Sequence, residues 1–94
     1  MKVHWTGTAE KHLDSIYRYI AQNSPEYANH MVDRLTARSQ QIAAFPLSGR
    51  SVPEFEAQHV REVIEGSYRI VYYIKSDQID ILAVIHGAQN TFAE

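Results

Sequence analysis

Three acid–base side chains occupy positions where they could do chemistry. His86 follows the apolar run Ile81–Ile85 in an Ile-His-Gly ending, and an imidazole there could act as a general acid or base near neutral pH. Glu54 and Glu56 lie in a stretch without a hydrophobic period and could supply a general base. A two-carboxylate site needs convergent geometry, which this spacing does not establish. The simpler interpretation of His86 is a strand-end histidine in a hydrogen-bond network.

Three arginines could form a small basic patch on the same part of the molecule: Arg50, Arg61 and Arg69. A guanidinium is always charged and can bind phosphate or carboxylate oxygens in pairs. The patch could therefore receive acidic groups of a partner. Tyr73 would join it, because side chains two or four apart on a strand share a face.

A structural role explains the same arginines without any ligand. Arg69 could order the sheet by pairing with Glu62 or Glu65 on the neighbouring strand. Arg50 and Arg61 would then be ordinary surface charges, whose isolated pairs contribute about 0–1 kcal/mol.

Neither a metal nor a cofactor is expected. The chain has no cysteine, so a disulfide framework and a thiolate metal site are both excluded. No HxxxH or HExxH spacing occurs. The remaining histidines are scattered along the chain: His4, His12, His30 and His59.

Length and charge narrow the class of protein. The 94 residues suit a single domain, residues 1–94, with a net charge of −2. A protein that binds nucleic acid through phosphates usually carries a strong basic excess, whereas residues 48–94 hold four Lys/Arg and seven Asp/Glu. The longest apolar runs are five residues, far too short for a membrane span, and the N-terminus lacks the apolar core of a signal peptide. We expect a cytoplasmic protein that makes no membrane contact.

Hydrophobic period predicts two helices in the first half. Apolar residues recur at helical spacing from Ala9 to Ile20, with Thr6 or Thr8 as the N-cap. Ser24 followed by proline is a typical start for a second helix, which should run to about Ala44 before Phe45-Pro46 ends it. Both helices have one apolar side, so the hairpin needs a sheet to cover.

Strand patterns fill the second half. A loop, Leu47–His59, precedes three predicted strands, and a fourth short strand, Lys2–Trp5, begins the chain. Gly66-Ser67 suits a two-residue hairpin turn. The last strand is apolar at nearly every position and should be central, pairing with Lys2–Trp5. The predicted strands of the second half are Val60–Glu65, Tyr68–Ile74 and Ile79–Ile85. The predicted fold class is α+β, a helical hairpin on a small, mostly antiparallel sheet in the order β-α-α-β-β-β.

This order resembles the RelE/ParE superfamily of toxins from type II toxin–antitoxin (plasmid stabilisation) systems. Four local features carry the resemblance across nearly the whole chain: AEKHLDSIYRYI, GRSVPEF, REVIEGSYRIVYYI and ILAVIHG. Each is weak alone, and all four in this order are fairly specific. The glycine-arginine loop and the Ile-His-Gly ending are more similar to the ParE branch than to the RelE branch.

The resemblance implies a toxin that a cognate antitoxin holds inactive by wrapping it with a C-terminal segment. ParE-like toxins poison DNA gyrase and stop replication, without acting as enzymes themselves. We therefore expect an antitoxin and gyrase as partners, and DNA binding only through the antitoxin complex, which represses its own operon.

The RelE branch supplies the alternative function, a ribosome-dependent mRNA endoribonuclease with the ribosome and mRNA as partners. In that branch the arginine matching Arg69 contacts the scissile phosphate, and some members use a C-terminal His, here His86. This chain departs from many ParE-like relatives by having neutral Gln89 and Asn90 where a basic and an acidic residue occur. If those positions contact the target, a non-toxic, antitoxin-binding relative is a further alternative.

Overall fold

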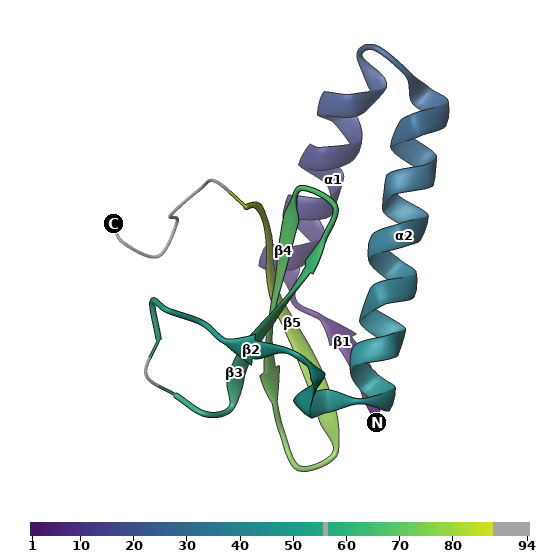
Figure 1. The fold of residues 1–94 in the computed structure, drawn as a ribbon. Helices are drawn as coiled ribbons and strands as arrows, with labels where there is room; N and C mark the ends of the chain where they lie inside the picture. The colour runs from purple at the N-terminus through teal and green to yellow at the C-terminus, as the bar shows by residue number, and fades with distance from the viewer. Residues whose placement is uncertain (56, 88–94) are drawn as a thin grey trace.

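A computed structural model describes residues 1–55 and 57–87 and folds them into two layers (Figure 1). A hairpin of two helices, α1 (Gly7–Ala21) and α2 (Pro25–Ala44), covers one face of a sheet. The strands of that sheet lie in the order β1-β5-β4-β3-β2. Their bounds are β1 (Lys2–Trp5), β2 (Arg50–Ser51), β3 (Val60–Glu65), β4 (Tyr68–Ile74) and β5 (Gln78–His86). The predicted α+β architecture is confirmed.

Both helices begin where their capping residues predict. The Thr6 hydroxyl accepts a hydrogen bond from the Ala9 backbone N–H at 3.2 Å, and the Ser24 hydroxyl accepts one from Tyr27 N–H at 3.1 Å. Each bond satisfies one of the N–H groups that a helix start leaves without a partner. Pro25 occupies the first helical position of α2, where its missing N–H costs nothing.

The sheet is antiparallel except at one edge. β3, β4 and β5 form a meander, and β1 pairs with β5 in parallel, with Val3 opposite Ile79. β5 lies inside the sheet, between β1 and β4, and its pairing with Lys2–Trp5 is as predicted, whereas the middle strand of the sheet is β4. Gly66 has φ of +60° in the β3–β4 turn, a conformation that costs glycine nothing.

The segment predicted as the loop Leu47–His59 contains regular structure. A 3₁₀ helix, η1 (Pro46–Ser48), follows α2, and β2 then adds an edge strand to β3. The prediction missed both because each is too short to show a hydrophobic period. The chain thus returns to the sheet directly after η1.

The sheet is buried on both faces. Under the helices lies a cluster that includes Leu35, Ile42, Ile70, Tyr72 and Ile81, each fully buried. On the opposite face, which we call the far face, the segment after β2 inserts Val52 into a second cluster. The other members of that cluster are Val60, Val71, Ala83 and Ile85.

A β-bulge in β5 reverses the side-chain pattern of that strand. Val71 pairs with Ala83 and Tyr72 with Ile81, so Leu82 is an extra residue. Leu82 and Ala83 both pack toward the far face. Beyond them the alternation is inverted, because one added residue moves every following side chain to the other face. Val84 therefore enters the core beneath the helices, and His86 follows it onto that side.

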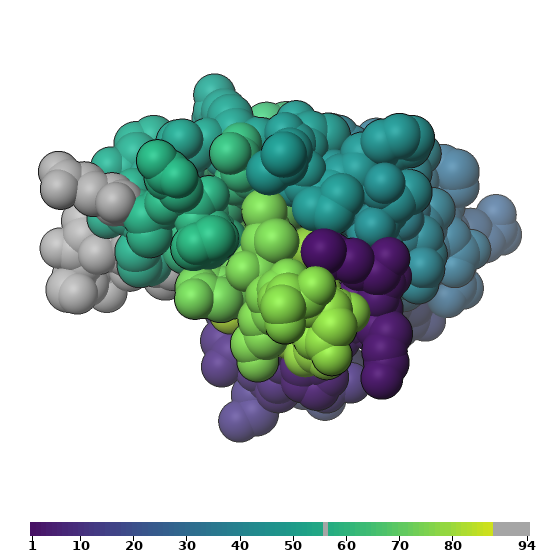
Figure 2. All heavy atoms as spheres, turned by 90° about the horizontal axis from the view of Figure 1, so that it is seen from below, coloured from purple at the N-terminus to yellow at the C-terminus, as the bar shows by residue number. Residues whose placement is uncertain are grey.

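One end of the molecule gathers segments that are distant in sequence. Figure 2 views this end and shows the N-terminal residues in purple beside the teal segment where α2 ends and the lime turn between β4 and β5. The Met1 amino group donates to the Ala43 carbonyl oxygen at 3.2 Å. Within the described ranges no helix is both long and apolar enough to cross a membrane.

Candidate functional site

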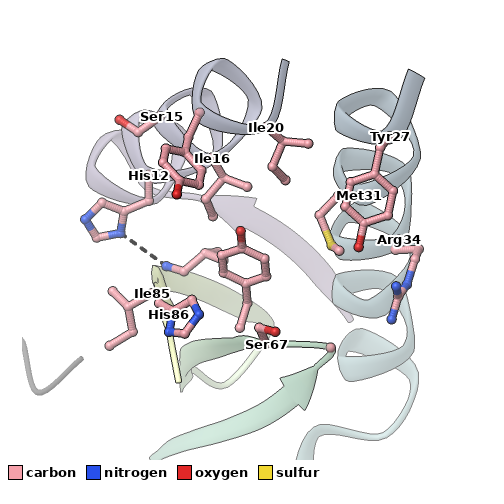
Figure 3. Close-up of a pocket in the computed structure, with 14 residues that line it drawn as sticks. His12, Ser15, Ile16, Ile20, Tyr27, Met31, Arg34, Ser67, Ile85 and His86 are labelled. Carbon is pink, nitrogen blue, oxygen red and sulfur yellow. Dashed lines mark hydrogen bonds between the residues drawn. The ribbon is translucent and has the colours of Figure 1, made fainter. Parts of the chain in front are cut away.

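A groove opens on the helix side of the sheet, at the end that holds the α1–α2 turn (Figure 3). It has a volume of about 830 Å³ and lies between the two helices, the β3–β4 turn and the end of β5. Its walls are mainly aliphatic and aromatic. The tyrosines Tyr19 and Tyr27 are 72% and 50% exposed, so large apolar surface is left open there. The other apolar lining residues include Ile16, Ile20, Met31, Tyr68 and Ile85.

Among the described residues, the lining of this groove carries no carboxylate. Its charged and titratable side chains are His12, Arg34 and His86, apart from the tyrosine hydroxyls. Arg34 is held by Glu65, with Nη2 at 2.7 Å from Oε2. A ligand for this groove should therefore be apolar, with acidic rather than basic groups at its margin.

The two histidines of the groove are placed by different contacts. The Val84 backbone N–H donates to His12 Nδ1 at 3.2 Å. The pairing of β1 with β5 ends at Ile81, so a side chain of α1 accepts this hydrogen bond of β5 in place of β1. His86 is exposed, and its ring meets Tyr68 edge-on with centroids 5.9 Å apart. Burial raises the pKa of the Tyr68 phenol above its ordinary value.

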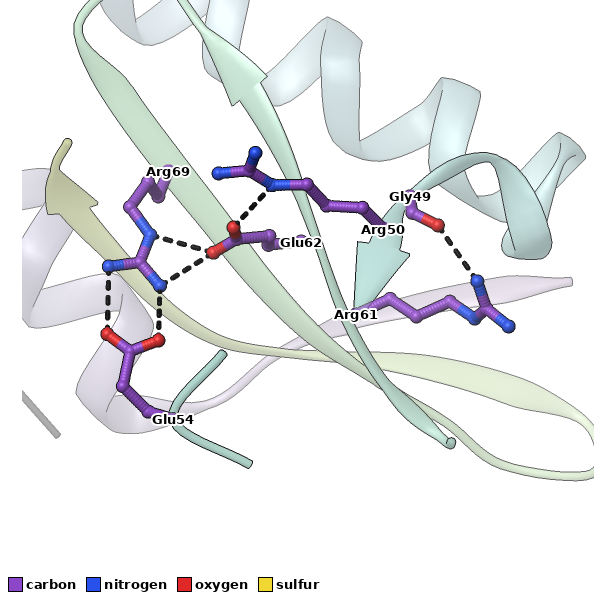
Figure 4. A network of polar contacts seen from close by, with 6 residues as sticks. All are labelled: Gly49, Arg50, Glu54, Arg61, Glu62 and Arg69. Atoms are coloured by element: carbon purple, nitrogen blue, oxygen red, sulfur yellow. Dashed lines mark hydrogen bonds and ion pairs between the residues drawn. The ribbon is translucent and has the colours of Figure 1, made fainter. Parts of the chain in front are cut away.

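A buried network of charges occupies the far face (Figure 4). Glu62 is 1% exposed and lies between two arginines: Arg69 Nε donates to Oε1 at 2.7 Å and Arg50 Nε to Oε2 at 2.7 Å. Arg69 also donates two hydrogen bonds to the Glu54 carboxylate, from Nη1 to Oε2 at 3.1 Å and from Nη2 to Oε1 at 2.9 Å. Two arginines and two carboxylates thus form a paired set.

The hydrogen bonds that Arg69 donates to the Glu54 carboxylate raise the pKa of Arg69 above its ordinary value, despite burial. The same hydrogen bonds lower the pKa of the Glu54 carboxyl. Arg69 is 6% exposed, and its bidentate contact with Glu54 has the geometry that a phosphate or an external carboxylate would need. An external anion would have to displace Glu54 to bind there.

The predicted basic patch does not form as one surface. Arg61 lies opposite Tyr72 in the β3–β4 register, whereas Arg69 lies opposite Ile64. Arg61 therefore points to the helix face and Arg69 to the far face, because neighbouring residues of a strand alternate. Arg61 Nη1 donates instead to the Gly49 carbonyl oxygen at 2.9 Å. Only Arg50 joins Arg69.

The suggested pairing of Arg69 is right for Glu62 and wrong for Glu65. Glu65 is on the helix face and binds Arg34 and, at 3.7 Å, Arg38. Tyr73 shares the far face with Arg69, is 37% exposed, and lies beside the His59 ring at 6.2 Å.

Three sequence candidates, Glu56, Gln89 and Asn90, fall outside the described residues. The groove residues Tyr19 and Tyr27 were missed as site residues, because the sequence places a tyrosine on each predicted helix but does not show that both are exposed at one groove. Within the described ranges no three His, Asp or Glu side chains come together as a metal site.

The two candidate catalytic residues lie on opposite faces of the sheet. Arg69 is opposite Ile85 in the β4–β5 register, and His86 is opposite Tyr68. A general acid must reach its reacting atom within about 3 Å, so one bond cannot lie against both side chains. The described residues thus form an open groove on the helix side of the sheet and a set of internal ion pairs on the far face.

A helical hairpin on this mostly antiparallel sheet defines the fold of the RelE/ParE toxins. The family model described as "ParE toxin of type II toxin-antitoxin system, parDE" matches residues 3–91. This chain therefore belongs to the ParE toxin family, and it is a toxin of a type II toxin–antitoxin system.

Individual relatives agree with this membership. A protein of Sinorhizobium fredii named "Putative toxin Y4kP" is 32% identical over 90 residues, covering 94% of this chain and 90% of that protein. A chain of the chromosomal ParDE system from P. aeruginosa is 26% identical and superposes with a TM-score of 0.75, covering 92% of this chain and 95% of that one. A chain of the RelBE2 toxin–antitoxin complex from Mycobacterium tuberculosis shares the fold at 21% identity and a TM-score of 0.57, with 90% and 95% coverage.

Removing Arg69 should destabilise the protein strongly. Arg69→Ala leaves Glu62 buried, with Arg50 as its one remaining side-chain partner among the residues that the structure describes. We expect a loss of about 3 kcal/mol in the free energy of unfolding, the lower end of the range for breaking a buried pair, because Arg50 still binds the carboxylate. Urea denaturation measures this. The matched control is Arg18→Ala, whose pair with Asp14 is exposed and should contribute about 0–1 kcal/mol. Equal stabilities of the two variants would contradict the assignment.

The Glu54–Arg69 contact should make stability fall in acid. Arg69 lowers the pKa of Glu54 in the folded state, so this contact stabilises the protein above the ordinary carboxyl pKa and is lost as pH falls through the lowered value. Glu54→Gln should therefore be less stable than the parent at neutral pH, and the difference should shrink with acidification. Thermal unfolding between neutral pH and pH 3 tests this. A difference that stays constant with pH would show that the Glu54 charge is not involved.

Proposed function

We propose that this ParE-family toxin arrests growth by binding DNA gyrase and inhibiting replication, and that a cognate antitoxin neutralises it. The observation that carries the proposal is the placement of Arg69 and His86 on opposite faces of the sheet. Ribonuclease chemistry needs a charge-stabilising group and a proton donor at one phosphate. The separation of Arg69 and His86 favours a toxin that inhibits its target by binding to it rather than by cleaving RNA.

The occupation of Arg69 supports the same proposal. Its guanidinium binds Glu62 and Glu54 and is almost wholly buried. A scissile phosphate at Arg69 would compete with a carboxylate already held at two points within the same chain. The net charge of −2 also disfavours direct binding to nucleic acid, which leaves a protein as the favoured target.

The groove beneath the helical hairpin is the surface we assign to the antitoxin. Its aromatic walls suit the apolar side of an amphipathic helix laid along the groove. The described part of its lining has no carboxylate, which suits acidic residues on that helix, beside Arg34 and the two histidines. The two structural neighbours come from toxin–antitoxin systems, which supports an antitoxin as the partner.

Induction of this protein alone in bacteria should stop DNA synthesis before protein synthesis. Pulse labelling with thymidine and with an amino acid, in parallel after brief induction, measures both. Gyrase inhibition blocks replication directly and affects translation only later. Early loss of protein synthesis would instead support the mRNA endoribonuclease alternative. Accumulation of folded protein with neither effect would favour the non-toxic relative.

Removing aromatic side chains from the walls of the groove should weaken antitoxin binding. The pair Tyr19→Ser and Tyr27→Ser removes two exposed rings from its walls, and we expect at least a tenfold rise in the Kd for the cognate antitoxin, or about 1.4 kcal/mol. Isothermal titration with the purified proteins measures this. The control is Tyr73→Ser, which removes a part-exposed tyrosine from the far face. Equal effects of the two changes would place the antitoxin elsewhere.

A further inference from the structure

The edge of β5 that pairs with β1 loses its strand partner partway along. The pairing ends at Ile81, where Thr6 closes the corner before α1. The Thr6 backbone N–H and hydroxyl both donate to the Ile81 carbonyl oxygen, at 3.1 and 2.7 Å. Val84 lies three residues further along β5 and is 2% exposed. A backbone N–H buried there needs an acceptor that β1 does not provide, because an unsatisfied buried donor is costly.

His12 of α1 supplies this acceptor. The Val84 N–H donates to His12 Nδ1 at 3.2 Å, across 72 positions of sequence, and Figure 3 draws the bond as a dashed line. A backbone N–H can only donate, so Nδ1 must offer a lone pair, and in the uncharged ring the proton lies on Nε2. Both residues line the groove. This hydrogen bond, which we call the His12 clasp, therefore ties the end of β5 to α1 at one wall of the groove.

Protonation of His12 is incompatible with the clasp. An imidazolium ring carries a hydrogen on both nitrogens, so Nδ1 would change from an acceptor to a donor that faces another donor. Histidine is the side chain whose charge ordinarily changes between about pH 5 and pH 8. The proton that charges the ring thus removes the acceptor and leaves the buried Val84 N–H without this hydrogen bond.

The surroundings of His12 offer no counter-charge for the protonated ring. The titratable and charged groups of the described groove lining come from every wall: Tyr19 from α1, Tyr27 and Arg34 from α2, Tyr68 from β4 and His86 from β5. Arg34 is already a cation, and His86 gains positive charge in the same pH range. The α1 residues three and four positions from His12 are all uncharged: Thr8, Ala9, Ser15 and Ile16. Nothing in this part of the described structure compensates for the lost bond.

We propose that His12 is a pH-sensitive switch, which holds the groove in its binding shape at neutral pH and releases the end of β5 from α1 in acid. This inference rests on the proposed function, which assigns the groove to the antitoxin, and it predicts that acid weakens antitoxin binding. A charged His12 would also attract acidic residues of the antitoxin. The clasp should dominate, because attraction between solvated charges is weak, whereas an unsatisfied buried N–H is costly.

Hydrogen exchange at the Val84 amide, followed by NMR on the protein alone, tests the clasp without any ligand. The protection factor, taken relative to an unstructured amide at the same pH, should fall about tenfold or more from about pH 7.5 to about pH 5.5. The matched variant is His12→Asn. Its side-chain oxygen takes the place of Nδ1 as an acceptor and binds no proton in this range, so protection of Val84 should stay constant.

Two further variants separate His12 from the other histidines. His59→Asn removes an exposed histidine from the loop before β3, and the Val84 amide should keep the pH dependence of the parent. His86→Asn removes the second histidine of the groove, and the pH dependence should also persist. Loss of the pH dependence in either variant, with His12 intact, would overturn the assignment to His12.

Isothermal titration with the purified cognate antitoxin, at the same two pH values, tests the effect on binding. On acidification the Kd of the parent should rise about threefold or more beyond the rise for His12→Asn. His86 and the ionisable groups of the antitoxin are present in both measurements, so their titration cancels in the comparison.

The outcomes separate the clasp from the proposed function. If the protection of Val84 is the same at both pH values, or falls equally in His12→Asn, the clasp is overturned and the proposed function stands. If protection falls as expected but the Kd of the parent rises no more than that of His12→Asn, control of the groove by His12 is overturned. If the parent does not bind the antitoxin at neutral pH, the proposed function fails, and the Val84 amide still decides whether the clasp exists.

Discussion

The carboxylate of Glu62 is enclosed within the far side of the sheet, and the surrounding structure is arranged to compensate its charge. A buried ion is costly unless it is paired and hydrogen-bonded, and Glu62 is shared between Arg69 and Arg50. Arg69 in turn holds Glu54, which secures the segment after β2 across the far face. Val52 enters the second core cluster from the same segment. One buried charge thus links the edge strand, the following segment and the centre of the sheet.

The sheet divides the molecule into two surfaces with different properties. The helix side carries an open aromatic groove, whereas the far face near Arg69 is closed by internal ion pairs. The β-bulge at Leu82 separates the two candidate catalytic residues, because it places His86 on the helix side of the sheet while Arg69 lies on the far face. This arrangement suits a protein that acts through contact with other proteins.

Much of the fold followed from local pattern. Helical spacing of apolar residues, Thr6 and Ser24 as caps, and the strand runs around Gly66-Ser67 all predicted elements that the structure contains. These signals are readable because each depends on residues close in sequence. The site was less predictable: Glu62 was one of two suggested partners of Arg69, Arg61 was assigned to the wrong face, and the short elements η1 and β2 gave no period to read. Each of these outcomes depends on which residue lies opposite another across strands.

The sequence by itself determined the α+β class, the order of the long elements, the resemblance to the RelE/ParE toxins and the absence of a basic excess. Those properties are sums over short windows or over the whole composition. Only the tertiary structure decided that Leu82 is an extra residue in β5, that Glu62 rather than Glu65 meets Arg69, and that Tyr19 and Tyr27 wall a groove. Strand register and helix packing bring together residues far apart in the chain, and a one-residue change in register moves a side chain to the opposite face.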